Sequence, residues 1–260
     1  MVNLKNNNVL IKHFALLLTF LLVTSCAKSN YFVSKIEAKK ININDKQAAS
    51  AEIDNYIKPF RDNIDADLSA VLAYNPENLE KSGGKWQTNI GNFLADVTLQ
   101  KGNEMSLKQQ NKTVDICLLN HGGIRSIIPK GNVTARNAFE VMPFENTAIV
   151  VSLKGEDVIE MVKYIINEKK PHPLAGMSFK IDKNNQPQNI LINLKPLELD
   201  EIYNVITSDY LSNGGDNMIF FKKGITFFDI NYKLRNMMID YFKDVDTLKI
   251  NNDIRINQIN

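Results

Sequence analysis

Apolar residues recur along the chain at two spacings, one typical of helices and one typical of strands. The first clear helical stretch covers residues 48–66, where apolar residues stand three or four positions apart: Ile53, Ile57, Phe60 and Ile64. This spacing places them on one face and predicts an amphipathic helix. Residues 65–74 have a pattern more typical of a strand, and one further strand is predicted upstream over residues 31–43.

A second helix is expected to begin at Asn89, whose side chain is suited to capping the free N–H groups of a first turn. Four apolar residues at helical spacing form its inward face: Ile90, Phe93, Leu94 and Val97. The exposed N–H groups of such a helix start also suit an anion.

The most informative stretch is residues 114–146, which opens with an apolar run from Val114 to Leu119. The run is short enough to predict a buried strand. It ends at Asn120-His121-Gly122-Gly123, a small polar turn that permits close approach of a ligand. Arg125 follows, with a planar guanidinium suited to phosphate or carboxylate.

The rest of this stretch and the residues after it complete the pattern. Thr134 is suited to capping a short helix, and Pro143-Phe144-Glu145-Asn146 follows before the next apolar run. Helices are predicted over residues 155–169, with Ile159, Val162 and Ile166 inward, and over 230–242. Strands are predicted over residues 147–153, 177–181, 190–194 and 203–208, and again after residue 246. Because strands outnumber helices without regular alternation, we predict an α+β fold, a mixed β-sheet with packed helices.

The N-terminus has the features of an export signal. Lys5, Lys12 and His13 precede an apolar run from Phe14 to Val23, which at ten residues is too short to span a bilayer. Thr24-Ser25-Cys26 then resembles a bacterial lipobox, so residues 1–25 are interpreted as a lipoprotein signal peptide and Cys26 as the lipid anchor. Residues 26–47 would be a polar tether, and residues 48–256 the domain. The alternative is a cleavable signal that ends near Ser25, with Cys26 a bystander.

Composition excludes some classes of partner. The 44% hydrophobic and 23% charged content is that of a globular protein. The net charge of +2 is dispersed, without the clustered basic patch of a nucleic-acid-binding protein. If Cys26 is lipidated, Cys117 remains as the second of the two cysteines, and its apolar surroundings indicate a small buried hydrophobe rather than a nucleophile.

Three blocks of this chain, all within residues 86–220, resemble the C-terminal domain of the 5′-nucleotidase family. The blocks are Asn89–Asp96 (NIGNFLAD), Asn120–Arg125 (NHGGIR) with PFEN after it, and Ser208–Asp216 (SDYLSNGGD). They occur in the order in which the family carries similar blocks, which makes the resemblance far more specific than any one block alone.

The resemblance implies a role for each matching residue. Phe144 and Tyr210 would sandwich a nucleobase, and Asp216 would accept hydrogen bonds from the ribose hydroxyls. The remaining substrate-binding candidates are Asn146 at the base edge, Asn120 and Arg125 on the phosphate side, the glycines Gly122 and Gly123, and Asn92 facing the cleft. Asp96 is expected to be structural.

The chain also departs from the family pattern. Tyr210 stands where relatives usually have phenylalanine, His121 replaces a glycine, and Lys85 or Trp86 lies where relatives place a further arginine. Glu145 adds negative charge beside an anionic ligand. These departures weaken the phosphate side of the predicted site more than the nucleoside side.

The family's catalysis depends on two metal ions held in an N-terminal domain. Only His121 and His172 follow Cys26, and Asn120-His121 lacks the accompanying metal-binding motifs. We therefore expect no cofactor and no metal in this chain, and divalent metals in a separate metallophosphatase chain. The chain is predicted to be inactive alone and to act when that partner is added.

Two alternatives remain. The protein is a non-catalytic, membrane-tethered nucleoside or nucleotide receptor, exposed at the periplasmic face or the cell surface, if no metallophosphatase reading frame lies beside its own. It is an interaction protein with a relic pocket if Tyr210 and Phe144 pack directly against each other.

Overall fold

The computed structural model describes residues 4–23, 31–44 and 47–259, and the chain divides into two units, Met1–Ala51 and Glu52–Asn260. The first unit contains helix α1 (Leu4–Val23), and residues 8–21 of this helix are exposed. No helix in the described ranges is both long and apolar enough to cross a membrane. Cys26 lies outside the described residues, so the proposed lipid anchor stays a prediction.

Residues 31–44 contain neither helix nor strand, and the strand predicted over 31–43 is therefore wrong. Their apolar side chains, among them Phe32, Val33 and Ile36, are exposed. An apolar pattern forms a strand only when neighbouring strands satisfy its backbone groups, and this segment has no such neighbour among the residues described.

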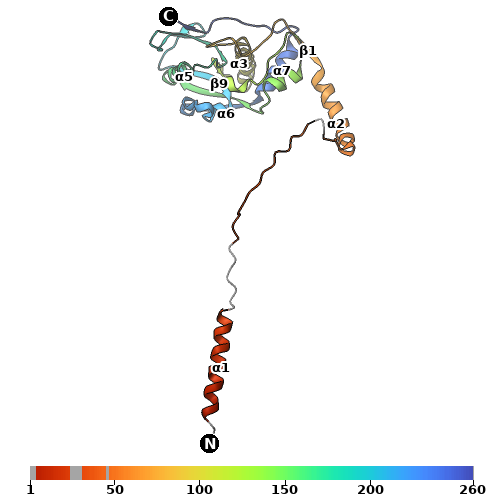
Figure 1. Ribbon diagram of the computed structural model, residues 1–260. Coiled ribbons are helices and arrows are strands. Elements are labelled where there is room, and N and C mark those ends of the chain that lie inside the picture. The colour runs from red at the N-terminus through yellow and green to blue at the C-terminus, as the bar shows by residue number, and fades with distance from the viewer. Residues whose placement is uncertain (1–3, 24–30, 45–46, 260) are drawn as a thin grey trace. The chain divides into compact units, whose positions relative to one another are not determined.

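The second unit contains three sheets (Figure 1). A five-stranded sheet has the order β10-β4-β9-β2-β5, a four-stranded sheet has the order β11-β6-β7-β8, and β1 pairs with β3. The strands are β1 (Val71–Asn75), β2 (Ile116–Leu118), β3 (Gly131–Thr134), β4 (Thr147–Lys154), β5 (Leu174–Ala175), β6 (Met177–Ile181), β7 (Pro187–Ile192), β8 (Lys195–Pro196), β9 (Ile202–Ser208), β10 (Thr226–Lys233) and β11 (Ile256–Gln258).

Helices and short 3₁₀ turns connect and cover these strands. They are α2 (Ala51–Ser69), α3 (Asn89–Gln110), η1 (His121–Gly123), α4 (Ala135–Val141), α5 (Gly155–Glu168), α6 (Asp209–Ser212), η2 (Gly215–Asn217), η3 (Ile219–Lys223) and α7 (Leu234–Asp244). In the five-stranded sheet β2 runs parallel to β9, whereas β4 runs antiparallel to it. The predicted α+β fold with a mixed sheet is confirmed.

The central sheet is covered on both faces, as the alternation of its side chains shows. Ile149 and Val151 of β4 belong to a core cluster with α5, which also includes residues of the four-stranded sheet. Ala148 and Val150 point the other way, into a cluster with α3 and α7. Successive side chains of a strand point to opposite faces, so the strand can be apolar at every position.

The predictions of which helix face is buried are confirmed, but some predicted helix boundaries are wrong. The four residues expected inward on α3 are all buried, but its cap is Thr88, whose Oγ1 accepts from Gly91 N at 3.1 Å. Thr134 is the N-cap residue of α4, as predicted, and its N and Oγ1 donate to Asn137 Oδ1 at 2.9 and 3.2 Å. On α5, Val162 and Ile166 are buried and Ile159 is half-buried.

Two other segments differ from the sequence prediction. Residues 65–69 continue α2, because Leu68 extends the helical spacing of Ile64, and only residues 71–75 form the strand. Residues 230–233 belong to β10, which pairs with β4 again at Lys233 after an irregularity that follows Asp229, and α7 begins at Leu234. The strand expected after residue 246 is limited to β11.

Candidate functional site

A hollow of about 360 Å³ at one edge of the central sheet contains most of the predicted site. We call it the central pocket; its lining residues are Asn120, Gly122, Gly123, Arg125, Phe144, Asn146, Tyr210 and Asp216. All eight were predicted from the sequence as substrate-binding residues. They come from three separate segments of the chain, residues 120–125, 144–146 and 210–216.

The sheet topology explains why these segments meet. Strands β2 and β9 are parallel, so their carboxyl ends lie at the same edge of the sheet. Asn120 follows β2 and Tyr210 follows β9. Strand β4 is antiparallel to β9, which places its amino end, just after Asn146, at that edge as well. Ligands in open α/β sheets often bind at such an edge.

Asp216 is held in place by its neighbours. Its Oδ2 accepts from Asn120 Nδ2 at 2.7 Å and its Oδ1 accepts from the Tyr210 hydroxyl at 2.9 Å. Its backbone carbonyl accepts from the Tyr164 hydroxyl at 2.6 Å. Asp216 has a left-handed conformation (φ 50°), which positions an exposed carboxylate at the pocket with lone pairs left for a ligand.

The aromatic side chains of the pocket are exposed. Phe144 is 51% and Tyr210 is 48% exposed, so both rings have a face accessible to a ligand. Among the ring contacts of the described residues, none joins Phe144 to Tyr210. The packing expected of a relic pocket is therefore not observed.

Two glycines make room for this arrangement. A Cβ on Gly123 would lie 2.8 Å from Asn120 Oδ1, and one on Gly215 would lie 2.5 Å from the Tyr210 ring. Both distances are below normal van der Waals contact, so a side chain at either position would displace a pocket residue. Sequence reasoning did not assign Gly215 a role, although its position between Tyr210 and Asp216 is a usable signal.

Arg125 supplies positive charge at the rim. Its guanidinium carbon lies 5.9 Å from the centroid of the Phe144 ring, and its backbone N donates to Val141 O at 2.9 Å. The side chain is exposed, and within the described ranges of the chain no carboxylate forms an ion pair with it. A fixed cation of this kind is available to an anionic ligand.

Glu145 does not line the central pocket. It forms ion pairs with Lys233 and Arg235, and their hydrogen bonds, that of Lys233 first, lower the pKa of its carboxyl to about 2. Arg235 also donates to the carbonyls of Met142 and Pro143 at 3.2 Å each. The negative charge of Glu145 is therefore compensated locally, and Arg235 holds the loop that carries Phe144. This arginine of α7 was missed, because an isolated arginine near a helix start carries no sequence signal.

A buried histidine forms a hydrogen bond with the backbone of the glycine turn. His172 is 3% exposed, and its Nδ1 accepts from His121 N at 3.3 Å. Its ring lies 5.7 Å from that of Tyr164, the residue that also contacts Asp216. Burial lowers the pKa of His172 to about 4, so it is neutral and able to accept this hydrogen bond at neutral pH. His121 itself is half-buried and not part of the pocket lining.

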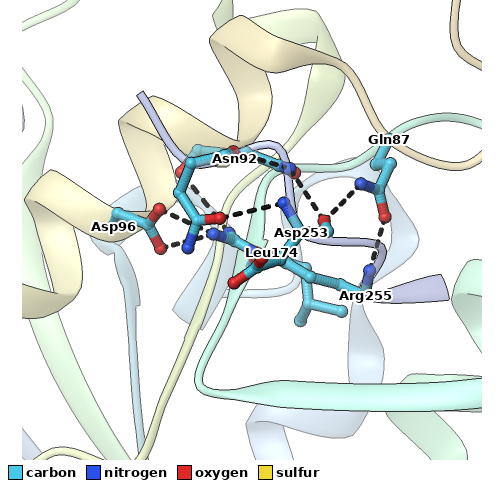
Figure 2. Close-up of polar contacts among 7 residues, drawn as sticks. Gln87, Asn92, Asp96, Leu174, Asp253 and Arg255 are labelled. Atoms are coloured by element: carbon cyan, nitrogen blue, oxygen red, sulfur yellow. Dashed lines mark hydrogen bonds and ion pairs between the residues drawn. The ribbon is translucent and has the colours of Figure 1, made fainter. Parts of the chain in front are cut away.

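Asn92 is not brought together with the other candidates. It is buried on α3, where its Nδ2 donates to the carbonyls of Asn251 and Asp253 at 3.3 Å each (Figure 2). Its role in ligand binding stays a prediction. Asp96, one turn further along, pairs with Arg255 through both carboxylate oxygens, which agrees with its expected structural role.

Lys85 and Trp86, the positions where relatives place a further arginine, do not face the central pocket. Lys85 donates from Nζ to Gln258 Oε1 at 2.6 Å, and Trp86 donates to the same oxygen from Nε1 at 3.2 Å. Neither lines the central pocket. Both instead attach the loop before α3 to β11.

The described residues do not bring together the donors of a dimetal site. Among the residues that the structure describes, no group of three or more His, Cys, Asp or Glu is placed to hold a metal ion. Cys117 is fully buried, and burial raises the pKa of its thiol, so it behaves as the hydrophobe that was expected. The site offers recognition groups, namely rings, a carboxylate, amides and a guanidinium.

Comparison with known proteins agrees with this geometry. Residues 66–223 match the family model described as "5′-nucleotidase, C-terminal domain". A trifunctional nucleotide phosphoesterase of Bacillus subtilis is 30% identical over 160 residues, which are 56% of this chain and 10% of that protein. A 5′-nucleotidase of Vibrio parahaemolyticus is 23% identical, over 69% of this chain and 31% of its own length. The chain thus spans about a third or less of these relatives.

Solved structures show the same fold. The structure of a 5′-nucleotidase precursor from Thermus thermophilus is similar with a TM-score of 0.66 at 24% identity, covering 79% of this chain and 43% of that one. A Haemophilus influenzae NAD nucleotidase is similar with a TM-score of 0.58 at 17% identity, covering 81% and 42%.

Proposed function

Because the chain belongs to the 5′-nucleotidase family through its C-terminal domain, we propose that it is the nucleotide- or nucleoside-binding half of a 5′-nucleotidase. A separate metallophosphatase chain provides the metals and the hydrolysis of the phosphate ester. The observation that carries this proposal is the convergence of eight predicted residues on one hollow, with two exposed rings at its wall.

Each group of the pocket has a part in recognition. The base stacks between Phe144 and Tyr210, an interaction worth about 1–3 kcal/mol per base in other nucleic-acid sites. Asp216, oriented by Asn120 and the Tyr210 hydroxyl, accepts from the ribose hydroxyls. An ionised carboxylate has acceptor positions for both contacts.

The phosphate lies on the Arg125 side of the pocket, next to the glycine turn. Arg125 has no competing carboxylate among the residues described, and its planar guanidinium matches phosphate oxygens. Asn146 faces the base edge from the end of the loop that Arg235 holds. The Glu145 charge beside this loop is offset by Lys233 and Arg235, which removes much of the repulsion that a lone carboxylate would exert.

Export and attachment to a membrane through lipidated Cys26 form part of the same proposal. The polar segment after Cys26 would let the binding unit work at a membrane face outside the cytoplasm. The main alternative, a tethered receptor without a catalytic partner, shares the pocket and differs only in the absence of hydrolysis when metallophosphatase chains are added.

Calorimetric titration with adenosine and AMP, without metal, tests the pocket. Tyr210→Ala or Phe144→Ala should weaken adenosine binding about 5- to 150-fold, the equivalent of one lost stacking face. Arg125→Ala should weaken AMP binding and leave adenosine unchanged. Phe227→Ala, which removes an equally exposed ring on β10, is the control and should change neither.

Addition of a metallophosphatase chain from the same genome tests the catalytic half. Hydrolysis of AMP by the mixture, and by neither chain alone, is the expected outcome. Metal-dependent hydrolysis by the purified 260-residue chain would contradict the proposal, as would the absence of adenosine and AMP binding at millimolar concentration.

A further inference from the structure

Helix α2 exposes an apolar face. None of its residues is buried, yet four apolar residues on adjacent turns are 38% to 74% exposed: Tyr56, Ile57, Phe60 and Ile64. We call these four residues the α2 stripe. Tyr56 and Phe60 contact each other with ring centroids 6.0 Å apart, so the stripe is continuous. Large apolar side chains gathered on one helix face indicate an interaction surface.

The helix also has little to stabilise it alone. Pro59 lies inside it, where the missing N–H and the ring cost about 3 kcal/mol relative to alanine. In proteins most helical stability comes from the packing of an apolar face rather than from helix propensity, and α2 buries none of its residues. Its last turn is attached to α4 through the exposed ion pair of Asp65 with Arg136 at 2.7 Å, a contact worth about 1 kcal/mol or less. Burial of the α2 stripe against another surface would offset this deficit.

Spacing and charge restrict what covers the stripe. Ile57, Phe60 and Ile64 continue the spacing of Ile53 in steps of four, three and four residues, which matches the seam of helices packed on other protein helices. The helix contains five acidic and two basic residues, so an anionic lipid surface would repel it.

Most charged residues of α2 are directed away from the stripe. At about 100° per residue, Asp54, Asp62 and Asp65 lie on flanking or opposite faces of the helix. There they form ion pairs with Arg61, Lys58 and Arg136. The stripe itself is therefore an apolar seam, and its occupant is indicated by the position of α2 in the chain.

The position of α2 indicates which partner this is. The match to the family's C-terminal domain begins at residue 66, inside the last turn of α2. A C-terminal domain is joined to the part of its protein that precedes it at this end. We propose that the α2 stripe is the docking surface for the metallophosphatase chain. This inference rests on the function proposed above and adds the surface through which the two chains combine.

The test compares two variants of the 260-residue chain that place the same new charge on opposite faces of α2. Phe60→Glu puts a carboxylate into the α2 stripe, and Asn55→Glu puts one on the polar face. The probe is the metallophosphatase chain that gives AMP hydrolysis with the wild type. Its concentration for half-maximal activity should rise at least about 30-fold with Phe60→Glu, as for loss of an interface hot spot, and stay unchanged with Asn55→Glu.

Two further measurements separate docking from folding and from pocket function. AMP binding by Phe60→Glu alone, measured by calorimetry, should equal that of the wild type, because α2 buries no residue. The rate at saturating partner should also be unchanged. Ile64→Ala, a milder change in the same stripe, should shift the half-maximal concentration in the same direction.

The outcomes distinguish this inference from the proposed function. Equal activation of wild type and Phe60→Glu would overturn the docking surface and leave the proposed function intact. Absence of activity with every metallophosphatase chain of the genome would overturn both. Dimerisation of the wild type that Phe60→Glu abolishes, or α2-dependent binding to phosphatidylglycerol vesicles, would overturn the inference in favour of a second copy or a membrane.

Discussion

The ion pair between Arg255 and Asp96 fastens the C-terminal segment across the start of α3, and its removal gives a sharp test of how this fold is held. Arg255 Nη2 lies 2.7 and 2.6 Å from the two carboxylate oxygens of Asp96 (Figure 2). Its Nη1 donates to the carbonyl of Leu174 and, at 3.4 Å, to that of Asn92. The Arg255 side chain is 9% exposed and that of Asp96 is 36% exposed. Arg255, directly before β11, is therefore joined to α3 and to the strand β5 in a mostly buried setting.

The expected change in the free energy of unfolding follows from two opposing effects, the burial of the Asp96 carboxylate and its attraction to Arg255. The pKa of Asp96 is raised because its burial outweighs the attraction of Arg255, so the pair as a whole adds little stability at neutral pH. Arg255→Met removes the attraction and leaves the burial, which typically costs 3–5 kcal/mol for a buried pair. Because the Asp96 side chain is still about a third exposed, we expect Arg255→Met to lower the free energy of unfolding by about 3 kcal/mol, the lower end of this range.

The double variant Arg255→Met with Asp96→Leu removes both charges and should lie within about 1 kcal/mol of the wild type. The deficit of Arg255→Met should also shrink as the pH falls toward 4, because protonation of Asp96 removes the uncompensated charge. Urea unfolding followed by tryptophan fluorescence is a suitable assay. Trp86 is the single tryptophan, and it donates to Gln258 in β11, so it reports on the same segment.

Two results would refute this reasoning. One is a double variant as unstable as the sum of the two single variants, which would mean that the pair has no coupling. The other is an Arg255→Met variant as stable as the wild type, which would mean that Asp96 finds water or another donor without cost.

Three further predictions concern the site and the N-terminus. His172 has a folded-state pKa of about 4, below the value near 6.5 of an unfolded histidine. Its contribution of about 3 kcal/mol to the free energy of unfolding should therefore be complete above pH 6.5 and be lost as the pH falls toward 4. His172→Phe should remove this pH dependence in urea unfolding measured at a series of pH values, and an equal decline in both proteins would contradict the prediction. Tyr210→Phe keeps the ring and deletes the hydrogen bond to Asp216. Adenosine affinity measured by calorimetry should therefore fall only about 5-fold, the equivalent of about 1 kcal/mol. A loss as large as that of Tyr210→Ala would contradict the view that the Tyr210 hydroxyl acts only by orienting Asp216. Cys26→Ser should abolish incorporation of labelled fatty acid and release the protein from membranes, whereas labelling that persists would favour attachment elsewhere.

The pocket was predictable from sequence because its residues are carried by short blocks at strand ends. Asn120, Phe144 and Tyr210 each lie within a few residues of a buried strand, and an apolar run that stops at small polar residues marks such a place. Their convergence depends on strand direction, which periodicity does not encode. The resemblance to a family supplied that part of the prediction.

What the sequence did not predict depends on contacts between distant segments. Arg235 and Arg255 act through partners about 90 and 160 residues away, and nothing near either residue indicates those partners. Residues 230–233 have a helical pattern but form the end of β10, where Lys233 pairs with Thr147 of β4 after an irregularity in the register. Residues 31–43 show the converse, since an apolar pattern without a neighbouring strand leaves no sheet to join.

The same physical reasoning connects the pocket to α2. The central pocket has its rings exposed, its carboxylate positioned and its cation available, which are the properties of a surface prepared to bind a ligand. The proposed function requires a second set of groups at the phosphate side of the pocket, and the described residues contain no metal cluster. A binding half that depends on another chain must also carry a surface to hold that chain. The α2 stripe is apolar, exposed and immediately before the matched domain, which is where the proposed function places the second chain.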